Sequence, residues 1–444
     1  MALFCDAACL VKFTREKGAH IVKLVPEDFD FGGNDQFIVS CAFPELYSQA
    51  DSIFASSIHC ANCYTWSFIF DKTQYSIILS SHHFLADVFL NFLQSIKACF
   101  SGKDPDFIFN ETWKLVTSWP YDQPKNTLTI ISPTTNENND KSNKRTNSNS
   151  NRNLNADLDN NSSRTCCGVD FDYDVESHEI SLGNHQIFFS AFDPGVWLGV
   201  DVNYHIIWHT LLTGKNILLV GDNPYQVTNA VFSVISLCMP FMYCEEYLAF
   251  TRLGDPRFAE VINGSTRYKI VGTTNRLVLE RCKQFSVIGV LKDPIDPKID
   301  VRDPIYRRSK SLTLKLEDVL NDLIDEDPYS DYLGLNIVKE DLEGYFSHSK
   351  ARSKQLTIEE VLEFQKTHTF RKWRKAISGR PTFRDAFLSV QPMQVLENRK
   401  DEELEHILDI LQTLEKKYEN DGHMLAVIGR HKHIAKQKLK DHKK

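Results

Sequence analysis

Two strand–turn–helix junctions in the middle of the chain constrain its fold more than any other feature. Short apolar runs at Asn216–Val220 and Tyr268–Val271 each end in a polar turn, and each turn opens a helix. A third apolar run follows at Phe285–Val290. Apolar strands that alternate with helices are typical of a mostly parallel sheet covered on both faces. The sequence therefore predicts an α/β fold for this region.

The two polar turns indicate where each helix begins and what the region can bind. The first turn, Gly221–Pro224, offers Asp222 or Asn223 as a helix cap, with its proline in the first helical position. The second turn, Gly272–Asn275, offers its asparagine as a cap. Such sheets bind ligands at the carboxyl ends of their strands. Neither turn matches a phosphate-binding motif, however, so we expect no nucleotide cofactor.

Composition and charge exclude several classes of function. The chain has 444 residues and a net charge of −8, so the whole molecule is not predicted to bind nucleic acid. Its 11 cysteines are scattered, as is usual in a reducing compartment. The segment Met1–Phe13 lacks the basic start of a secretory signal. We therefore expect a cytoplasmic protein.

Two groups of residues have the spacing of partial metal sites. Cys60 and Cys63 form a C-x-x-C pair, and His205 and His209 lie one helical turn apart. Neither group has a second ligand pair nearby in the sequence. Reduced thiols and partly buried polar side chains explain them better, so we expect no metal.

Residues 1–119 are predicted to form one α/β domain that begins with strands. Apolar runs at Leu10–Phe13 and His20–Val25 flank a polar turn with a glycine and indicate a hairpin. A second hairpin is predicted around the turn Asp71–Gln74, and a further strand at Phe37–Ala42.

A long helix follows the second hairpin. Ser80 or Ser81 is expected to cap it. Its apolar residues recur at helical spacing and predict a face that packs on the sheet: Leu85, Val88, Phe89, Phe92, Leu93, Ile96 and Phe100. Another helix is predicted at Phe107–Trp119.

Residues 120–175 are predicted to be a disordered linker or insertion. Within 134–163, 11 of 30 residues are Asn, and Ser, Thr, Asp and Lys supply most of the others. Such a composition cannot bury enough apolar surface to offset the entropy of ordering. We expect this stretch to act as a spacer.

Residues 176–299 contain the predicted parallel sheet. Its first strand is expected near Glu179–Phe189 and its first helix at about Val196–Leu212, with Gly214 as a C-cap. A short helix is expected to start at Asp255.

Residues 300–444 are predicted to be helical. Helices are expected at Leu312–Ile324, at Thr357–Ile377, which begins with a capping box, and at Glu402–Tyr418. The last fifteen residues hold seven Lys or Arg and one Asp. This basic tail could contact an anionic membrane or an acidic partner; a solvated, frayed end is the alternative.

Several short motifs, taken in order, resemble those of the DENN-domain family. They include Ala42–Glu45, Ser76–Phe100, the segment Leu211–Val220 that ends in an apolar strand, and Ile270–Asn275, which is similar to a G-x-T-N signature. The resemblance covers about 1–119 and 176–293, whereas the Asn-rich insertion is not a family feature. It implies an N-terminal longin-like α/β domain, a parallel-sheet α/β DENN core and a helical C-terminal part.

The resemblance also implies a function without covalent chemistry. Such a protein would be a guanine-nucleotide exchange factor for a Rab-type small GTPase, which would bind between the longin and DENN lobes. Exchange would take place in the cytoplasm, peripherally on endosomal or Golgi-type membranes. Two alternatives stay open: a scaffold or adaptor without exchange activity, and a GTPase-activating relative that supplies an arginine finger. Arg15 is the one arginine before Arg145, so it is the finger candidate of the longin part.

The candidate GTPase-facing residues come from the turns after the parallel strands and the charged link between them. They are Asp222, Asn223, Arg252, Asp255, Arg257, Thr273, Thr274 and Asn275. Caps, turns and salt bridges within a domain use the same residue types, so each residue also has a purely structural interpretation.

Overall fold

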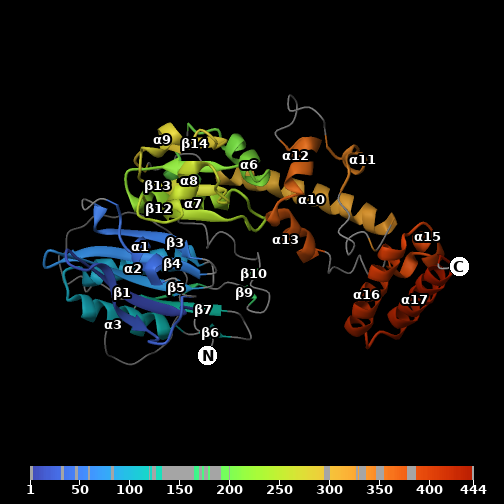
Figure 1. Cartoon of the computed structure of the whole chain (residues 1–444), viewed down its shortest axis with the longest axis horizontal. Coiled ribbons are helices and arrows are strands. Elements are labelled where there is room, and N and C mark those ends of the chain that lie inside the picture. Colours follow the sequence, from blue (N-terminus) through green and yellow to red (C-terminus); the bar gives the residue numbers. More distant parts are fainter. Residues whose placement is uncertain are drawn as a thin grey trace, which may run out of the picture. The chain divides into compact units, whose positions relative to one another are not determined.

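A computed structural model of the chain (Figure 1) shows a mixed α/β fold with a helical C-terminal part, as predicted. It describes residues 4–31, 35–45, 49–58, 61–81, 85–119, 121–122, 127–132, 165–169, 173–174, 179–180, 192–199, 201–294, 301–326, 329, 337–346, 355–377 and 387–442. The chain divides into two compact units. Unit 1 comprises Met1–Val202, Asn216–Ser236 and Glu246–Ile299, and unit 2 comprises Asn203–Lys215, Leu237–Glu245 and Asp300–Lys444.

Unit 1 begins with a five-stranded antiparallel sheet in the order β2-β1-β5-β4-β3. The strands are β1 Ala7–Thr14, β2 Gly18–Val25, β3 Ser52–Ile58, β4 Ala61–Phe70 and β5 Thr73–Ser81. Both predicted hairpins are confirmed. The turn of the second hairpin is Asp71-Lys72, and both residues have positive φ, which suits the twist of a two-residue hairpin loop. The edge strand β3 was not predicted.

Helices cover both faces of this sheet. Helix α1 (Asp35–Cys41) packs Ile38 and the following Ala42 against alternate residues of β1. Helices α2 (Ala86–Phe100) and α3 (Pro105–Thr117) lie on the other face, where Phe89 stacks on Tyr64 with ring centroids 4.7 Å apart. The predicted strand at Phe37–Ala42 is therefore wrong, because a short apolar run fits a buried helical turn as well as a strand.

The predicted cap of α2 is also wrong. Ser80 and Ser81 belong to β5, and the helix begins after Leu85, which makes no side-chain cap. The backbone N–H of Leu85 instead donates to the hydroxyl of Tyr64 at 3.2 Å. A hydrogen bond to a residue distant in the sequence thus takes the place of the local cap that was predicted.

Short strands occur within 120–175, on either side of the Asn-rich stretch. Strands β6 (Tyr121–Asp122), β7 (Thr127–Ser132) and β8 (Thr165–Val169) form an antiparallel sheet. The Asn-rich residues 134–163, predicted to be disordered, lie outside the described residues and connect β7 to β8. Of the strand predicted at Glu179–Phe189, the two residues of β10 (Glu179–Ile180) are described. They pair antiparallel with β9 (Tyr173–Asp174), so this part does not belong to the parallel sheet.

The second part of unit 1 is the predicted parallel sheet, in the order β12-β13-β11-β14. Its strands are β11 Ile217–Val220, β12 Tyr247–Thr251, β13 Ile270–Thr273 and β14 Val287–Val290, and all pair in parallel. The edge strand β12 was not predicted. Helices α8 (Phe258–Asn263) and α9 (Val278–Arg281) pack on one face through Val261, Val278 and Cys282.

Helix α7 (Pro224–Ser236) begins at Pro224 as predicted, and every residue in it except Tyr225 is buried. Its apolar face packs on the parallel sheet. Its polar face is also covered, because it lies against β3 of the antiparallel sheet: the hydroxyl of Thr228 accepts from the N–H of Ala55 at 3.3 Å. Phe54 of β3 contacts Phe250 of β12 at 5.1 Å. Helix α7 thus joins the two sheets of unit 1.

Two predicted long helices are each broken in the structure. Val196–Leu212 becomes α5 (Pro194–Trp197) and α6 (Tyr204–Leu212), separated near Gly199, which has φ of +89°. Thr357–Ile377 becomes α12 (Ile358–Phe364) and α13 (His368–Ile377). The capping box of Thr357 and Glu360 is confirmed.

The other described elements of unit 2 are helices as well. It contains α10 (Arg302–Glu326), α11 (Lys339–Leu342), α15 (Pro392–Leu396), α16 (Asp401–Lys417) and α17 (Gly422–His442). Helix α17 contains most of the basic tail, which is therefore folded against α16 rather than frayed. Its charges pair with α16: Lys432 contacts Glu415 at 2.6 Å.

A buried histidine lies in the core around α17. His431 is stacked on Phe387, and its Nδ1 lies 2.6 Å from the hydroxyl of Tyr329. Burial lowers the pKa of His431 to about 4, and the positive charge of Arg430 acts in the same direction. The folded state therefore holds this ring neutral at pH values where an exposed histidine takes up a proton.

We expect His431 to make unit 2 sensitive to acid. The unfolded chain binds a proton near pH 6.5, so the free energy of unfolding should fall by about 3 kcal/mol as the pH drops from there toward 4. Urea unfolding at a series of pH values measures this. In His431→Gln the fall over this pH range should be smaller by that amount, whereas replacing the exposed His433 by Gln should leave it unchanged. Equal slopes in all three proteins would contradict the prediction.

Candidate functional site

The predicted site residues follow three neighbouring strands of the parallel sheet. Asp222 and Asn223 come after β11, the segment from Arg252 to Arg257 comes after β12, and Thr273–Asn275 ends β13. Because these strands are parallel neighbours, their carboxyl ends lie along one edge of the sheet. The structure thus places all eight residues on the same edge, although at different depths.

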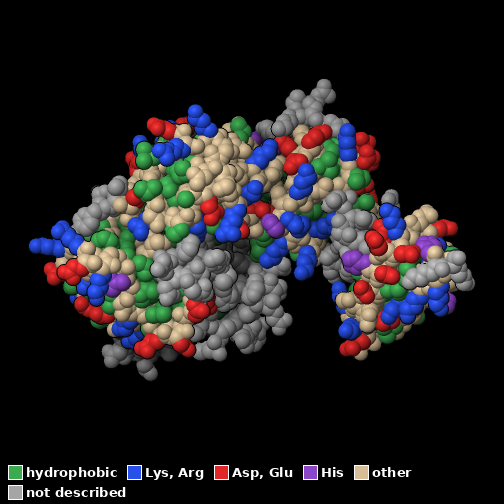
Figure 2. All heavy atoms as spheres, viewed as in Figure 1, with side chains coloured by type: hydrophobic (Ala, Val, Ile, Leu, Met, Phe, Trp, Pro, Cys, Tyr) green, Lys and Arg blue, Asp and Glu red, His purple; other side chains and the backbone are tan. Residues whose placement is uncertain are grey.

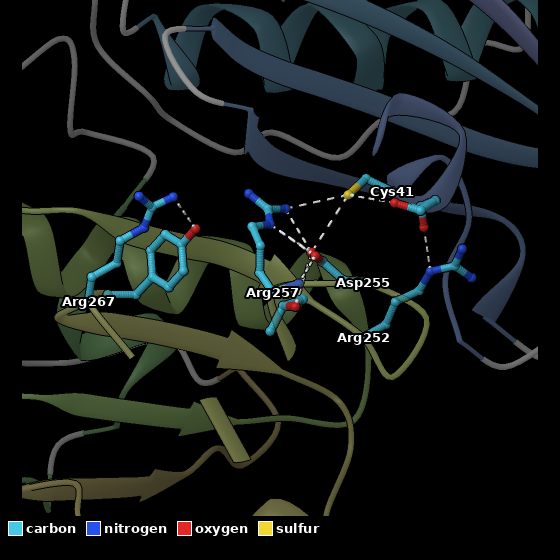
Figure 3. Close-up of polar contacts among 8 residues, drawn as sticks. Cys41, Arg252, Asp255, Arg257 and Arg267 are labelled. Atoms are coloured by element: carbon cyan, nitrogen blue, oxygen red, sulfur yellow. Dashed lines mark hydrogen bonds and ion pairs between the residues drawn. The ribbon is translucent and has the colours of Figure 1, made fainter. Parts of the chain in front are cut away.

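The deepest of them are Asp255 and Arg257, which form a buried ion pair (Figure 3). Their residues are 2% and 6% exposed. The guanidinium donates from Nη2 to Oδ2 of Asp255 at 2.7 Å and from Nε to Oδ1 at 2.9 Å. The backbone N–H of Arg257 and the hydroxyl of Thr251 also donate to the same carboxylate. The carboxylate is therefore well satisfied within the fold.

This ion pair faces the antiparallel part of unit 1. Nη2 of Arg257 lies 3.4 Å from Sγ of Cys41, the last residue of α1, and that thiol lies 3.7 Å from Asp255. Burial raises the pKa of Cys41 to about 11, and the charge of Asp255 adds to the effect. Burial alone would lower the pKa of Arg257, but its hydrogen bonds to Asp255 raise it overall. The thiol is neutral and the guanidinium is charged.

Asp255 and Arg257, which were predicted to face a partner, are therefore not on the exposed surface of unit 1. Both side chains are interior and join the two parts of unit 1. Thr273 is also fully buried, and its hydroxyl accepts from the N–H of Asn275 at 3.2 Å. The sequence shows a charged link but not the loop that covers it, because that loop comes from more than two hundred residues earlier in the chain.

Arg252 and Asn275 lie nearer to the surface and also contact the antiparallel part. Nε of Arg252 donates to the carbonyl of Ser40 at 2.7 Å, and burial lowers the pKa of this arginine. Nδ2 of Asn275 donates to Glu45 at 3.3 Å. The side-chain oxygen of Asn275 accepts from the N–H of Leu277 at 3.0 Å, so Asn275 supports the start of α9 as well.

Asp222 and Asn223 are exposed, as the prediction requires. The oxygen of the Asn223 side chain accepts from the N–H of Gln226 at 2.8 Å and caps α7. The carboxylate of Asp222 pairs with Arg276 at 2.6 Å, and both side chains are largely exposed. The backbone carbonyl of Asp222 accepts a hydrogen bond from Gln49 of the antiparallel part.

These contacts define a surface that both parts of unit 1 build together, which we call the composite edge. It consists of Glu45, Gln49, Asp222, Asn223, Arg252, Leu253, Asn275, Arg276 and Leu277. Two of its members are exposed apolar side chains: Leu253 is 64% exposed and Leu277 is 66% exposed. Sequence reasoning missed both, and the available signal was an apolar residue inside an otherwise polar turn.

The last two candidate residues are Thr274 and Arg15. The hydroxyl of Thr274 is buried and has no hydrogen-bond partner among the residues that the structure describes. Arg15 is exposed in the turn between β1 and β2. Phe13, close to that turn, contacts Phe43 edge-on at 6.1 Å, so the turn lies near the segment that leads to Glu45.

The cysteine and histidine pairs that have the spacing of metal ligands are described next. Cys60 lies outside the described residues, and Cys63 is buried, which raises its pKa to about 12. Nδ1 of His209 lies 3.1 Å from Glu360, while His205 contacts Arg308. Within the described part of the chain, no three His, Cys, Asp or Glu side chains are placed to hold a metal ion.

The composite edge combines exposed apolar side chains with polar and charged ones. Its cysteine neighbour, Cys41, is protonated, and the carboxylate of Asp222 on its surface is paired with Arg276. No protein-family model and no curated protein matches the chain. Among the described helices, none combines the length and the apolar character needed to cross a bilayer.

Proposed function

We propose that this protein is a guanine-nucleotide exchange factor for a Rab-type small GTPase, and that the GTPase binds at the composite edge. The observation that carries the proposal is that this edge is built from two sheets, one antiparallel and one parallel, whose loops contact each other. The resemblance to the DENN family in the order of its motifs supports the same function. The protein would act in the cytoplasm, peripherally on endosomal or Golgi-type membranes.

Exchange requires differential binding rather than bond chemistry. A factor that binds the nucleotide-free GTPase more tightly than the loaded form weakens nucleotide binding by the same ratio. Loosening a nucleotide ~10⁵-fold takes roughly 7 kcal/mol of differential contact. Exposed apolar side chains beside paired charges, such as Leu277 beside Arg276, suit a surface from which a partner excludes water.

The direct test is the release of labelled GDP from a panel of Rab-type GTPases in the presence of the full chain. We expect strong acceleration for one member or a small group. GTPase binding without acceleration would instead support an adaptor. Faster GTP hydrolysis that is lost in Arg15→Ala would support GTPase activation. No binding to any member would overturn the proposal.

We expect the combined change Asp222→Ala and Asn223→Ser to slow GDP release at limiting protein concentration by about tenfold, which corresponds to about 1.4 kcal/mol of lost contact. The serine keeps an oxygen to cap α7, and breaking the exposed pair with Arg276 should alter the stability by less than about 1 kcal/mol.

Glu111→Ala is the matched control for this variant. Glu111 pairs with Lys114 on the surface of α3, so the change also removes an exposed ion pair from unit 1. GDP release should be normal in the control. If both variants release GDP at the rate of the unaltered protein, the turn after β11 does not contact the GTPase.

A further inference from the structure

Helix α13 carries an unusual concentration of positive charge for this chain. Between Lys366 and Arg384 the sequence contains seven Lys or Arg and no Asp or Glu, whereas the whole chain has a net charge of −8. Five of the seven lie in the described part: Lys366, Arg371, Lys372, Arg374 and Lys375. Figure 2 shows Lys and Arg side chains gathered over α13.

The apolar side of α13 is already occupied within unit 2. Phe370 is buried, and it contacts Phe364 of α12 with ring centroids 5.3 Å apart. Trp373 contacts Phe241 at 5.5 Å. A strongly amphipathic helix usually needs a surface for its apolar face. In this protein the apolar face of α13 packs on other residues of unit 2, so the basic side of the helix faces outward.

The N-terminal end of α13 is fixed as well. The carboxylate of Glu245 accepts from the backbone N–H groups of His368 and Thr369, at 2.5 and 3.1 Å. The hydroxyl of Thr369 accepts from the N–H of Cys244 at 3.0 Å. These contacts neutralise the positive end of the helix dipole but leave the side-chain charges beyond the first turn in place.

The basic tail, by contrast, is largely compensated by its neighbour. Helix α16 places acidic residues beside α17, where Lys432 pairs with Glu415 and His442 pairs with Asp401, both at 2.6 Å. Of the basic residues at α13, Lys366 pairs with Glu363 at 2.7 Å, and Arg371 donates to the carbonyls of Thr367 and Lys366. By sequence, α16 and α17 together hold seven Lys or Arg and seven Asp or Glu, whereas α13 holds four Lys or Arg and no Asp or Glu.

We propose that the basic face of α13 binds the anionic phospholipid headgroups of a membrane surface. The fixed apolar side makes this an electrostatic contact at the headgroup level, without insertion of the helix. Phe370 and Trp373 are packed on other rings of unit 2, so these two side chains are not available to stack on bases, as single-stranded nucleic acid would require. The inference does not depend on the proposed exchange activity.

Vesicle sedimentation of the full chain tests this proposal. The protein should sediment with vesicles of phosphatidylcholine mixed with phosphatidylserine, not with phosphatidylcholine alone, and should be released by added salt. Each basic residue near an anionic surface contributes about fivefold, so the triple variant Arg371→Gln, Lys372→Gln and Lys375→Gln should bind roughly 100-fold more weakly. An unchanged melting curve of this variant would show that it is folded.

The matched control removes three exposed lysines from α16 and α17: Lys416→Gln, Lys436→Gln and Lys440→Gln. Its vesicle binding should change little. An equal loss in both variants would overturn the assignment to α13, as would full binding by the α13 variant. Absence of binding to anionic vesicles, together with retention on an acidic polypeptide column, would assign the helix to a protein partner instead.

Discussion

The variant Arg257→Met is expected to destabilise unit 1 by about 3–5 kcal/mol, because it leaves the carboxylate of Asp255 buried without its partner. Three hydrogen bonds of at most 3.2 Å join the two side chains, and both residues are buried. Denaturant unfolding of the full chain measures the loss. Faster hydrogen exchange in β12 and α8 would place it in the correct part of the fold.

Two further variants distinguish a buried ion pair from a simple loss of packing. Changing Asp255 to Leu together with Arg257→Met should recover much of the stability, because no isolated charge then remains. Arg276→Met removes an arginine from a pair whose side chains are 64% and 60% exposed, and it should cost less than about 1 kcal/mol. Similar losses from Arg257→Met and Arg276→Met would refute this account of the buried pair.

The variant Gly272→Ala is expected to destabilise unit 1 by about 3 kcal/mol or more. A Cβ atom at this position of β13 would lie 2.5 Å from the carbonyl oxygen of Ala249 and 2.5 Å from Cγ1 of Val227. The first obstacle is backbone of the neighbouring strand and cannot rotate away. Helix α7 would have to move off the sheet, and thermal unfolding of the full chain would report the damage.

Gly429→Ala is the opposite case and provides the control. Gly429 lies within α17, its φ is not positive, and a Cβ there meets no atom within 4 Å. Alanine should therefore stabilise the helix by about 0.5–1 kcal/mol. A Gly272→Ala protein as stable as the unaltered chain would mean that α7 packs less closely on β13 than the structure shows.

The local signals in the sequence were sufficient for much of the fold. Strand β11, the start of α7 at Pro224 and the hairpin across Gly18 follow from periodicity, caps and turn residues within a few positions of each other. The elements that were predicted wrongly or missed depend on contacts with residues far away in the sequence. The segment of α1 is helical because Ile38 packs on β1, and β3 is a strand because β4 pairs with it.

The candidate site likewise has features that the sequence predicted and features that it did not. The sequence predicted the polar turns after β11 and β13, but it did not predict β12, the strand that places the segment from Arg252 to Arg257 on the same edge. Which side chains reach the surface of that edge depends on the loop around Cys41 and Glu45, which buries Asp255 and Arg257 but leaves Leu253 and Leu277 exposed. No pattern within 220–280 carries that information.

The burial of α7 on both of its sides has a consequence for how unit 1 opens. A fluctuation that lifts β3 away from the helix uncovers polar groups such as Thr228, and one that lifts the parallel sheet uncovers its valines. Neither sheet can therefore loosen independently, and slow amide exchange should extend across both as a single cooperative block. A partner that binds the composite edge would contact one rigid body rather than two lobes that move about a hinge.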